Sequence, residues 1–142
     1  MSLILQVADA VVAELTATTF SQPLSVSRSY LPRVELTDLK VLRVTVVPSS
    51  VTVAAASRSQ TQRDVAIDVA VQKKLGQEQN ASLDPLLALA EEIAEHFRAK
   101  RLDSFPGALC VKTEFKPIYA PEHIEQLRTF TSVLTLTFRV IE

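Results

Sequence analysis

Apolar and polar residues alternate over one long stretch of the chain and then recur at helical spacing directly after it. Within residues 63–74 the apolar positions are Val65, Ile67, Val69 and Val71. Successive side chains of a strand point to opposite faces, so this stretch predicts a half-buried strand. The polar residues 76–81 that follow show no apolar period and are expected to form a loop.

The next segment has the spacing of an amphipathic helix that begins at Asp84 and Pro85. An aspartate oxygen can accept unpaired N–H groups of a first helical turn, and proline loses no hydrogen bond there. One stripe of this helix is apolar and consists of Leu86, Leu87, Ala90, Ile93, Ala94 and Phe97. The opposite side carries Glu91, Glu92, Glu95 and Arg98. We therefore expect the helix to lie across a sheet that contains the 63–74 strand.

Weaker patterns place the remaining elements. Residues 4–15 repeat apolar side chains at helical spacing, and Ser2 can cap that helix. Further strands are expected at residues 24–30, 41–47, 51–55, 109–116 and 130–140. Pro32 and Pro48 should end the first two, because proline donates no hydrogen bond to a neighbouring strand. Residues 51–74 then form a hairpin with a mobile, polar tip at Ser57–Gln62, and residues 121–127 a single helical turn.

The expected fold is a single domain over residues 1–142, of the α+β class, in the order α-β-β-β-β-α-β-β. It has a mainly antiparallel sheet of about five to six strands with two helices packed on one face. The last strand has a threonine-rich face, made of Thr129, Thr131, Thr135 and Thr137. Flat polar faces and unprotected edges of this kind invite pairing with another chain, so assembly is favoured over catalysis.

Composition narrows the function classes. The net charge of −1 and pI of 6.1 give no bulk attraction to nucleic acid or anionic membranes. The single cysteine, Cys110, excludes an internal disulfide and a cysteine zinc cluster, and fits a reducing compartment. No signal peptide is recognisable, and no segment approaches the ~18 apolar residues of a membrane span, so we expect no export and no membrane. With two glycines in 142 residues, phosphate loops and nucleophile elbows are not expected.

Two groups of side chains resemble metal sites. Glu91, Glu92, Glu95 and His96 share a helix, but the known helical zinc patterns need two histidines on one face, and His123 lies in a separate loop. A solvated helix face is favoured. Asp64 and Asp68 project from the same face of one strand and could hold Mg²⁺, yet no third ligand accompanies them. An exposed sheet face or a subunit contact is favoured there.

Basic residues mark both ends of the long strand: Arg58 and Arg63 at one end, Lys73 and Lys74 at the other. They either solubilise the edge or form a positive rim or lumen near nucleic acid. The candidate residues for a subunit interface, a tube interface or a lumen are Arg58, Arg63, Asp64, Asp68, Lys73 and Lys74. No catalytic, cofactor-binding or metal-binding residue is indicated.

The chain resembles a family of phage proteins in the order and length of its elements. Tyr30–Pro32 with Leu36 and Leu39, then Leu42–Pro48, is similar to the early strands of small tailed-phage neck proteins. The strand from Arg63 to Val71, the Asp84-Pro85-Leu86-Leu87 start and the Glu91-Glu92-Ile93 helix resemble the centre of the tail-terminator, or tail-completion, family. The closing strand at residues 130–140 is also similar in type to a strand of this family. These motifs are hydrophobic patterns that cover nearly the whole chain.

The resemblance implies a non-enzymatic protein of a phage or prophage that needs no cofactor. Such proteins form a ring, commonly of about six subunits, on the end of a finished tail tube and stop its polymerisation. The implied partners are other copies of the chain, the tail-tube protein, the head connector protein and genomic DNA, which passes through the lumen without sequence-specific contacts. The implied location is the virion tail or neck, after assembly in the cytoplasm of a bacterial host.

Two other functions stay open at this point. One is a small α+β ligand-binding or regulatory module that holds its ligand between helix and sheet. The scarcity of glycine and the absence of a polar cluster within an apolar stripe count against it. The other is a small hydrolase or nuclease built on Asp64 and Asp68.

Overall fold

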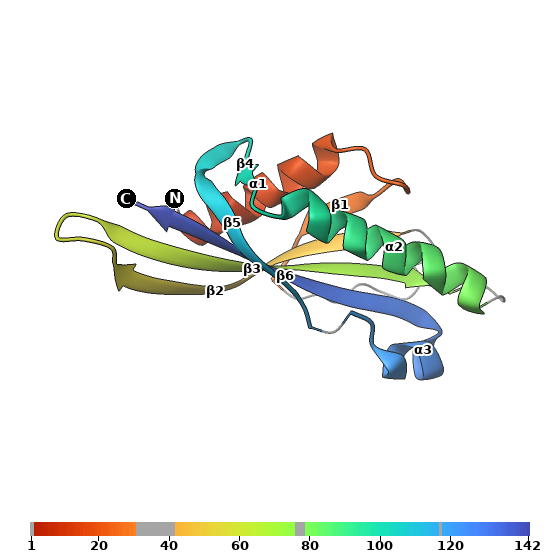
Figure 1. Cartoon of the computed structure of the whole chain (residues 1–142). Coiled ribbons are helices and arrows are strands. Elements are labelled where there is room, and N and C mark those ends of the chain that lie inside the picture. Colours follow the sequence, from red (N-terminus) through yellow and green to blue (C-terminus); the bar gives the residue numbers. More distant parts are fainter. Residues whose placement is uncertain (1, 31–41, 76–78, 117) are drawn as a thin grey trace.

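The computed structural model describes residues 2–30, 42–75, 79–116 and 118–142 (Figure 1). The chain is an α+β protein, as predicted. Its elements in order are α1 (Leu3–Ala17), β1 (Ser25–Arg28), β2 (Arg43–Ala55), β3 (Thr61–Lys74), α2 (Gln79–Phe97), β4 (Arg101–Leu102), β5 (Phe105–Phe115), α3 (Pro121–Leu127) and β6 (Thr129–Ile141).

The strands form one mixed, curled sheet in the order β1-β2-β3-β6-β5-β4. β1 runs parallel to β2, and all other neighbours are antiparallel. The long strands β3 and β6 pair from Gln62 with Ile141 to Lys74 with Thr129 and form the centre. Helices α1 and α2 cover one side of this sheet (Figure 1), which we call the helix face, and α3 lies beyond the end of β6 nearest Thr129.

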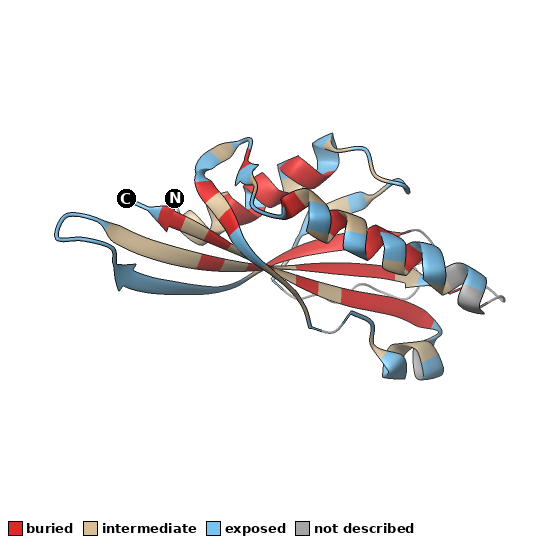
Figure 2. Cartoon of the chain, viewed as in Figure 1, coloured by how far each residue is buried: buried red, intermediate tan, exposed pale blue. Residues whose placement is uncertain are grey.

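The core lies between the helix face and the two long helices. Alternate residues of β3 and β6 are buried there: Val65, Ile67, Val69, Val71, Phe130, Leu134, Leu136, Phe138 and Val140. They meet an apolar stripe from each helix, which includes Val7, Val11, Leu15, Leu86, Leu89, Ile93 and Phe97. The predicted alternation of both strands is therefore confirmed, and the buried stripes are visible in Figure 2.

One predicted strand boundary is wrong. The strands expected at 41–47 and 51–55 are a single strand, β2, within the described residues 43–55. Pro48 does not end it; instead the register shifts between Pro48, opposite Ile67, and Ser50, opposite Ala66. Ser49 is therefore an extra residue in a β-bulge. A bulge interrupts the hydrogen-bond ladder, which is where a strand tolerates a residue without an N–H.

The predicted start of the second helix is also wrong. α2 begins at Gln79 rather than Asp84, so that Pro85 lies inside it and the expected loop is shorter. A proline inside a helix removes one hydrogen bond, which the packing of the apolar stripe can outweigh. Leu87, expected in the core, is half-buried, and Leu89 is fully buried instead.

Smaller elements differ as well. Residues expected to form a loop after α2 make the short strand β4 and the start of β5, with Leu102 opposite Phe105. The helical turn expected at 121–127 is present as α3. Ser2 is the N-cap residue of α1, but its side chain makes no capping hydrogen bond. The expectations for residues 31–41, including Pro32, Leu36 and Leu39, lie outside the described residues.

Candidate assembly surface

The β2–β3 hairpin extends past the helices as a narrow projection, which we call the hairpin arm (residues 48–64; Figure 1). Residues 49–60 are all exposed, as Figure 2 shows at the end of the hairpin. The turn is closed by the N–H groups of Ala56 and Ser57, which donate to the carbonyl oxygen of Gln60 at 3.1 and 3.2 Å. The hairpin predicted for residues 51–74 is thus confirmed, while the mobility of its tip stays a prediction.

The outer side of the arm is an unpaired sheet edge. β1 pairs with β2 only along Arg43–Val46, and the last contact is the Ser29 N–H donating to the Val46 carbonyl at 3.0 Å. From Ser49 to Ala55, no described strand pairs with this side of β2, and we call this segment the open edge. It carries no charged residue. Exposed edges usually carry lysines or other groups that discourage pairing, so an uncharged one is suited to accept another strand.

The bulge decides which side chains of the open edge point toward the helix face. Val51 pairs with the buried Val65 and Val53 with Arg63, which places both valines on that face. Neither is covered: Val51 is 41% and Val53 62% exposed. If Ser49 stood opposite Ala66, every later residue would shift by one and the valines would turn to the other face. The open edge therefore presents unpaired backbone groups together with two apolar side chains.

A second unpaired edge lies on the opposite side of the sheet. The contact of β5 with the β4 side ends at the Cys110 N–H, which donates to the Lys100 carbonyl at 2.9 Å. Residues 111–115, which we call the β5 edge, have no neighbour there in the described part of the chain. This edge is charged, since Glu114 Oε2 lies 3.3 Å from the Nζ atoms of both Lys112 and Lys116. The hydrogen bond from Lys112 is the main cause that lowers the pKa of Glu114.

A hollow of about 360 Å³ opens beside the β5 edge. It is lined by Arg98, Ala99, Leu109, Cys110, Val111, Lys112 and Thr113. Ala99 follows the end of α2 and has a φ of 51°, so that the chain turns sharply there before entering β4. Val111 is 41% exposed at the rim. Burial raises the pKa of the Cys110 thiol to about 11, so this thiol is protonated at neutral pH.

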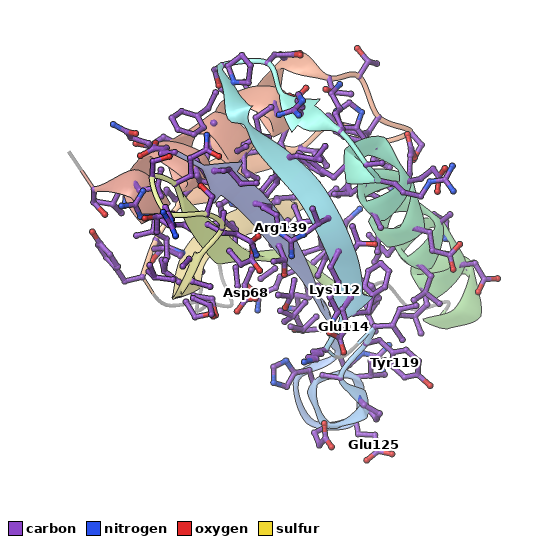
Figure 3. The ribbon with its side chains drawn as sticks, turned by 60° about the vertical axis from the view of Figure 1, so that its left-hand side comes forward. Asp68, Lys112, Glu114, Tyr119, Glu125 and Arg139 are labelled. Carbon is purple, nitrogen blue, oxygen red and sulfur yellow. The ribbon has the colours of Figure 1, made fainter. Side chains whose placement is uncertain are left out.

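The two predicted carboxylates are held by partners on β6. Asp64 accepts hydrogen bonds from Arg139, with Nε–Oδ1 at 3.0 Å and Nη2–Oδ2 at 3.3 Å, and raises the pKa of that arginine. Asp68 accepts a hydrogen bond from Thr135 Oγ1 at 2.7 Å. Both lie on the sheet face opposite the helix face, which we call the second face; Figure 3 shows Asp68 and Arg139 there with Lys112 and Glu114. Among the described residues no group of three His, Cys, Asp or Glu side chains could hold a metal ion.

The predicted basic residues occupy opposite ends of β3. Arg58 is exposed in the turn of the hairpin arm, and Arg63 binds Glu142 with Nη1–Oε2 at 2.9 Å. Lys73 and Lys74 pair with Phe130 and Thr129 at the other end of the sheet. A single chain therefore does not gather these four cations into one patch.

Sequence reasoning missed a buried carboxylate, Glu14, whose side chain is 4% exposed. Glu14 Oε1 accepts the backbone N–H of Asp103 at 3.1 Å, while Oε2 lies 3.3 Å from His96 Nε2 and 3.4 Å from Lys100 Nζ. Burial by itself raises the pKa of Glu14, but these hydrogen bonds and the Lys100 charge lower it below its ordinary value. The available signal was its position in the apolar stripe of α1.

The prediction of a solvated helix face is wrong at His96, which contacts Glu14. His96 is half-buried, and its ring makes edge contacts with Phe20 and Phe97, at centroid distances of 5.7 and 5.2 Å. The histidine thus lies between the two helices, where it contacts Glu14.

A scan of known protein families and a search of curated proteins both find no match for the chain. Of the helices in the described ranges, none has the length and apolar character needed to cross a membrane.

Proposed function

We propose that the chain is a structural phage or prophage protein that assembles into a ring at the end of a tail tube and stops tube polymerisation. The observation that carries this proposal is the hairpin arm with its uncharged open edge. An exposed edge with apolar side chains is a hazard for a protein that works alone, and is useful in one that binds other chains. The resemblance to the tail-terminator family supplies the kind of assembly.

The proposed mechanism is end-capping. One surface of the ring binds the last ring of tube subunits, and the opposite surface offers nothing to which a further tube subunit can add. That opposite surface then receives the head connector protein, and genomic DNA passes through the lumen. The finished protein is located in the virion tail or neck.

The predicted basic residues have places in this mechanism. Arg58 and Arg63 lie on the hairpin arm, where they can reach carboxylates of a neighbouring subunit or of the tube. Lys73 and Lys74, at the far end of β3, are proposed to line the lumen or a second contact. Asp64 and Asp68 are proposed to support the sheet through Arg139 and Thr135, at the side of a subunit contact.

The test is polymerisation of the tail-tube protein encoded in the same genome, with and without this chain, followed by electron microscopy. We expect short tubes that carry a ring of this protein at one end. Tubes of unchanged length without such a ring would overturn the proposal. The genes beside the coding sequence give an independent check, since capsid, connector and tube genes are expected there.

One observation favours the alternative, a ligand-binding module. A hollow of about 550 Å³ is lined by Gln22, Pro23, Leu24, Ser25, Leu42, Arg43 and Lys73. Its volume suits a small molecule, and its two cations would attract an anionic one. Thermal unfolding with inorganic phosphate, citrate or AMP tests this alternative. It gains support if one of them raises the melting temperature of the parent chain but not of a Lys73→Ala variant.

A further inference from the structure

We propose that the open edge of one copy of the chain pairs with the β5 edge of a second copy, so that the two sheets become continuous. This inference rests on the proposed function, because it names the contact that would join neighbouring subunits of the ring. It uses a strand-addition geometry, in which main-chain hydrogen bonds give affinity and side-chain pockets give specificity.

Backbone hydrogen bonding is the first argument. Residues 49–55 of β2 and residues 111–115 of β5 each have a strand on one side only within the described chain. The two segments have similar lengths, and each is already extended and held by its inner neighbour. A second copy can therefore add to either edge without refolding, which keeps the entropic cost of pairing low.

Shape is the second argument. Val51 and Val53 point to the helix face of the open edge, and the 360 Å³ hollow beside the β5 edge is bounded by Ala99, at the end of the helix that covers that face. β2 and β5 run in opposite directions within one sheet, so when the two edges pair antiparallel the helix faces of the two copies lie on the same side of the continuous sheet. The exposed valines of one copy then lie next to the hollow of the other, where the rim residue Val111 is also exposed. Pairing would remove all three apolar side chains from water.

Charge is the third argument, because it differs between this contact and a symmetric one in which two β5 edges pair. The other symmetric alternative is the pairing of two open edges. The β5 edge and the residue after it carry Lys112, Glu114 and Lys116, so two β5 edges paired antiparallel about Glu114 would place the two Glu114 side chains opposite each other and Lys112 opposite Lys116. The uncharged open edge avoids this conflict. Lys112 would instead face Ser50 and Thr52, whose hydroxyl groups can accept a hydrogen bond from its ammonium group. Pairing of two open edges would leave both β5 edges and both hollows uncovered.

The position of the two edges gives the symmetry of the assembly. They belong to opposite sides of one sheet, since β2 lies on one side of the β3–β6 centre and β5 on the other. A contact between different surfaces is head-to-tail, and repeated head-to-tail contacts form a closed ring or an open helix. The contact is therefore of the kind that a ring requires.

Cross-linking between single cysteine variants tests the contact directly. Val53→Cys and Thr113→Cys are prepared separately and treated with a short bis-maleimide, alone and as an equal mixture. The native Cys110 is buried and protonated, so the parent chain should remain unlinked. We expect dimers only in the mixture and a ladder of higher species in the double variant. Ala88→Cys, at an exposed position of α2, replaces either partner as the matched control and should give no dimer.

Each outcome decides the contact. Dimers from Val53→Cys alone, at the level of the mixture, would show that two open edges pair and would overturn the proposal. A mixture that links no better than the Ala88→Cys control would overturn it too. The proposed function is judged separately, by tube length: capped tubes without the cross-link keep the function and discard this contact, whereas cross-linked oligomers that leave tubes uncapped keep the contact and discard the function.

A charge on the open edge gives a second test with a different readout. Val53→Lys should weaken self-association by about tenfold or more in analytical ultracentrifugation, because the pairing would bury an ammonium group in an apolar contact beside the hollow that Arg98 lines. The melting temperature should stay close to that of the parent chain, since Val53 is 62% exposed. Ala88→Lys is the matched control. Unchanged association of the Val53→Lys variant would contradict the contact.

Discussion

Glu14 of α1 makes the polar contacts that connect the two long helices. Its carboxylate receives the Asp103 N–H and contacts His96 and Lys100, so a single buried side chain links α1 to the end of α2 and to the turn before β5. A buried carboxylate without such partners would be costly. The cluster therefore fixes the relative position of α1 and α2 over the sheet.

Acidification should weaken the fold through this residue. The pKa of Glu14 is lower in the folded chain than its ordinary value, so its carboxylate stabilises the fold above the unfolded-state pKa of about 4.3. That stabilisation is lost as the pH falls through the lower, folded-state pKa. We expect Glu14→Gln to be less stable than the parent chain at pH 7, and the difference to shrink toward pH 3.

Urea unfolding at a series of pH values measures this difference, with Glu91→Gln on the exposed side of α2 as control. A gap between Glu14→Gln and the parent chain that does not change with pH would mean that the carboxylate charge contributes nothing.

Phe97 should be the most costly side chain of α2 to truncate. It is fully buried, and its ring meets that of Phe138 edge-on at a centroid distance of 6.3 Å. Phe97→Ala should lower the free energy of unfolding by about 3–5 kcal/mol in a denaturant titration. Arg98→Ala, next to it but exposed, should change stability by no more than about 0.5 kcal/mol. A loss below about 1 kcal/mol for Phe97→Ala would show that the stripe does not face the sheet.

At the scale of elements, α2 carries a proline that its own geometry disfavours. Pro85 lies inside Gln79–Phe97 and cannot donate to the preceding turn. Pro85→Ala should therefore raise the free energy of unfolding, by up to about 3 kcal/mol. The hydrogen bond from Gln22 Nε2 to the backbone carbonyl of residue 85, at 3.3 Å, can persist in the variant. If stability were unchanged or lower by calorimetry, the helix would begin at Asp84, as the sequence pattern predicted.

The elements that sequence predicts well are those whose two faces differ in polarity. Along most of β3 and β6, fully buried apolar residues alternate with less buried ones, and α2 repeats its apolar stripe, so the pattern of apolar positions matches the pattern of burial. β2 could not be predicted in this way, because its proline suggested an end where the chain forms a bulge. The start of α2 was missed for a related reason: a proline is common at a helix start and tolerated inside only when packing outweighs the lost hydrogen bond.

The candidate site was only partly predictable. The arm and its arginines follow from the hairpin pattern, but the open edge depends on where β1 stops pairing with β2, which local sequence does not encode. The hollow beside the β5 edge likewise depends on the turn after α2 and on the short strand β4. Such features belong to the arrangement of elements far apart in the chain.

At the scale of the whole molecule, the charges of the arm should matter for attachment and little for folding. Arg63 binds Glu142 through side chains that are 34% and 59% exposed, and exposed ion pairs contribute only about 0–1 kcal/mol. Replacing Arg58 and Arg63 with Glu should leave the unfolding transition nearly unchanged and prevent capping of tubes. Ala88→Glu, at an exposed position of α2 that no proposed contact uses, is the control for a general charge effect. Normally capped tubes with the double variant would show that the arm does not dock through these arginines.

Ser49 has a consequence for the size of any ring built through the arm. A bulge bends its strand, so this one extra residue sets the angle at which the arm leaves the sheet. Pro48 already pairs with Ile67 and Ser50 with Ala66, so deletion of Ser49 would remove the bulge without changing these pairs. Val51 and Val53 would stay on the helix face, and the arm would straighten. The subunits would still pair, but each would meet the next at a different inclination. The ring would then close with a different number of subunits or open into a helix. The presence or absence of one residue at this position would therefore determine the diameter of the ring.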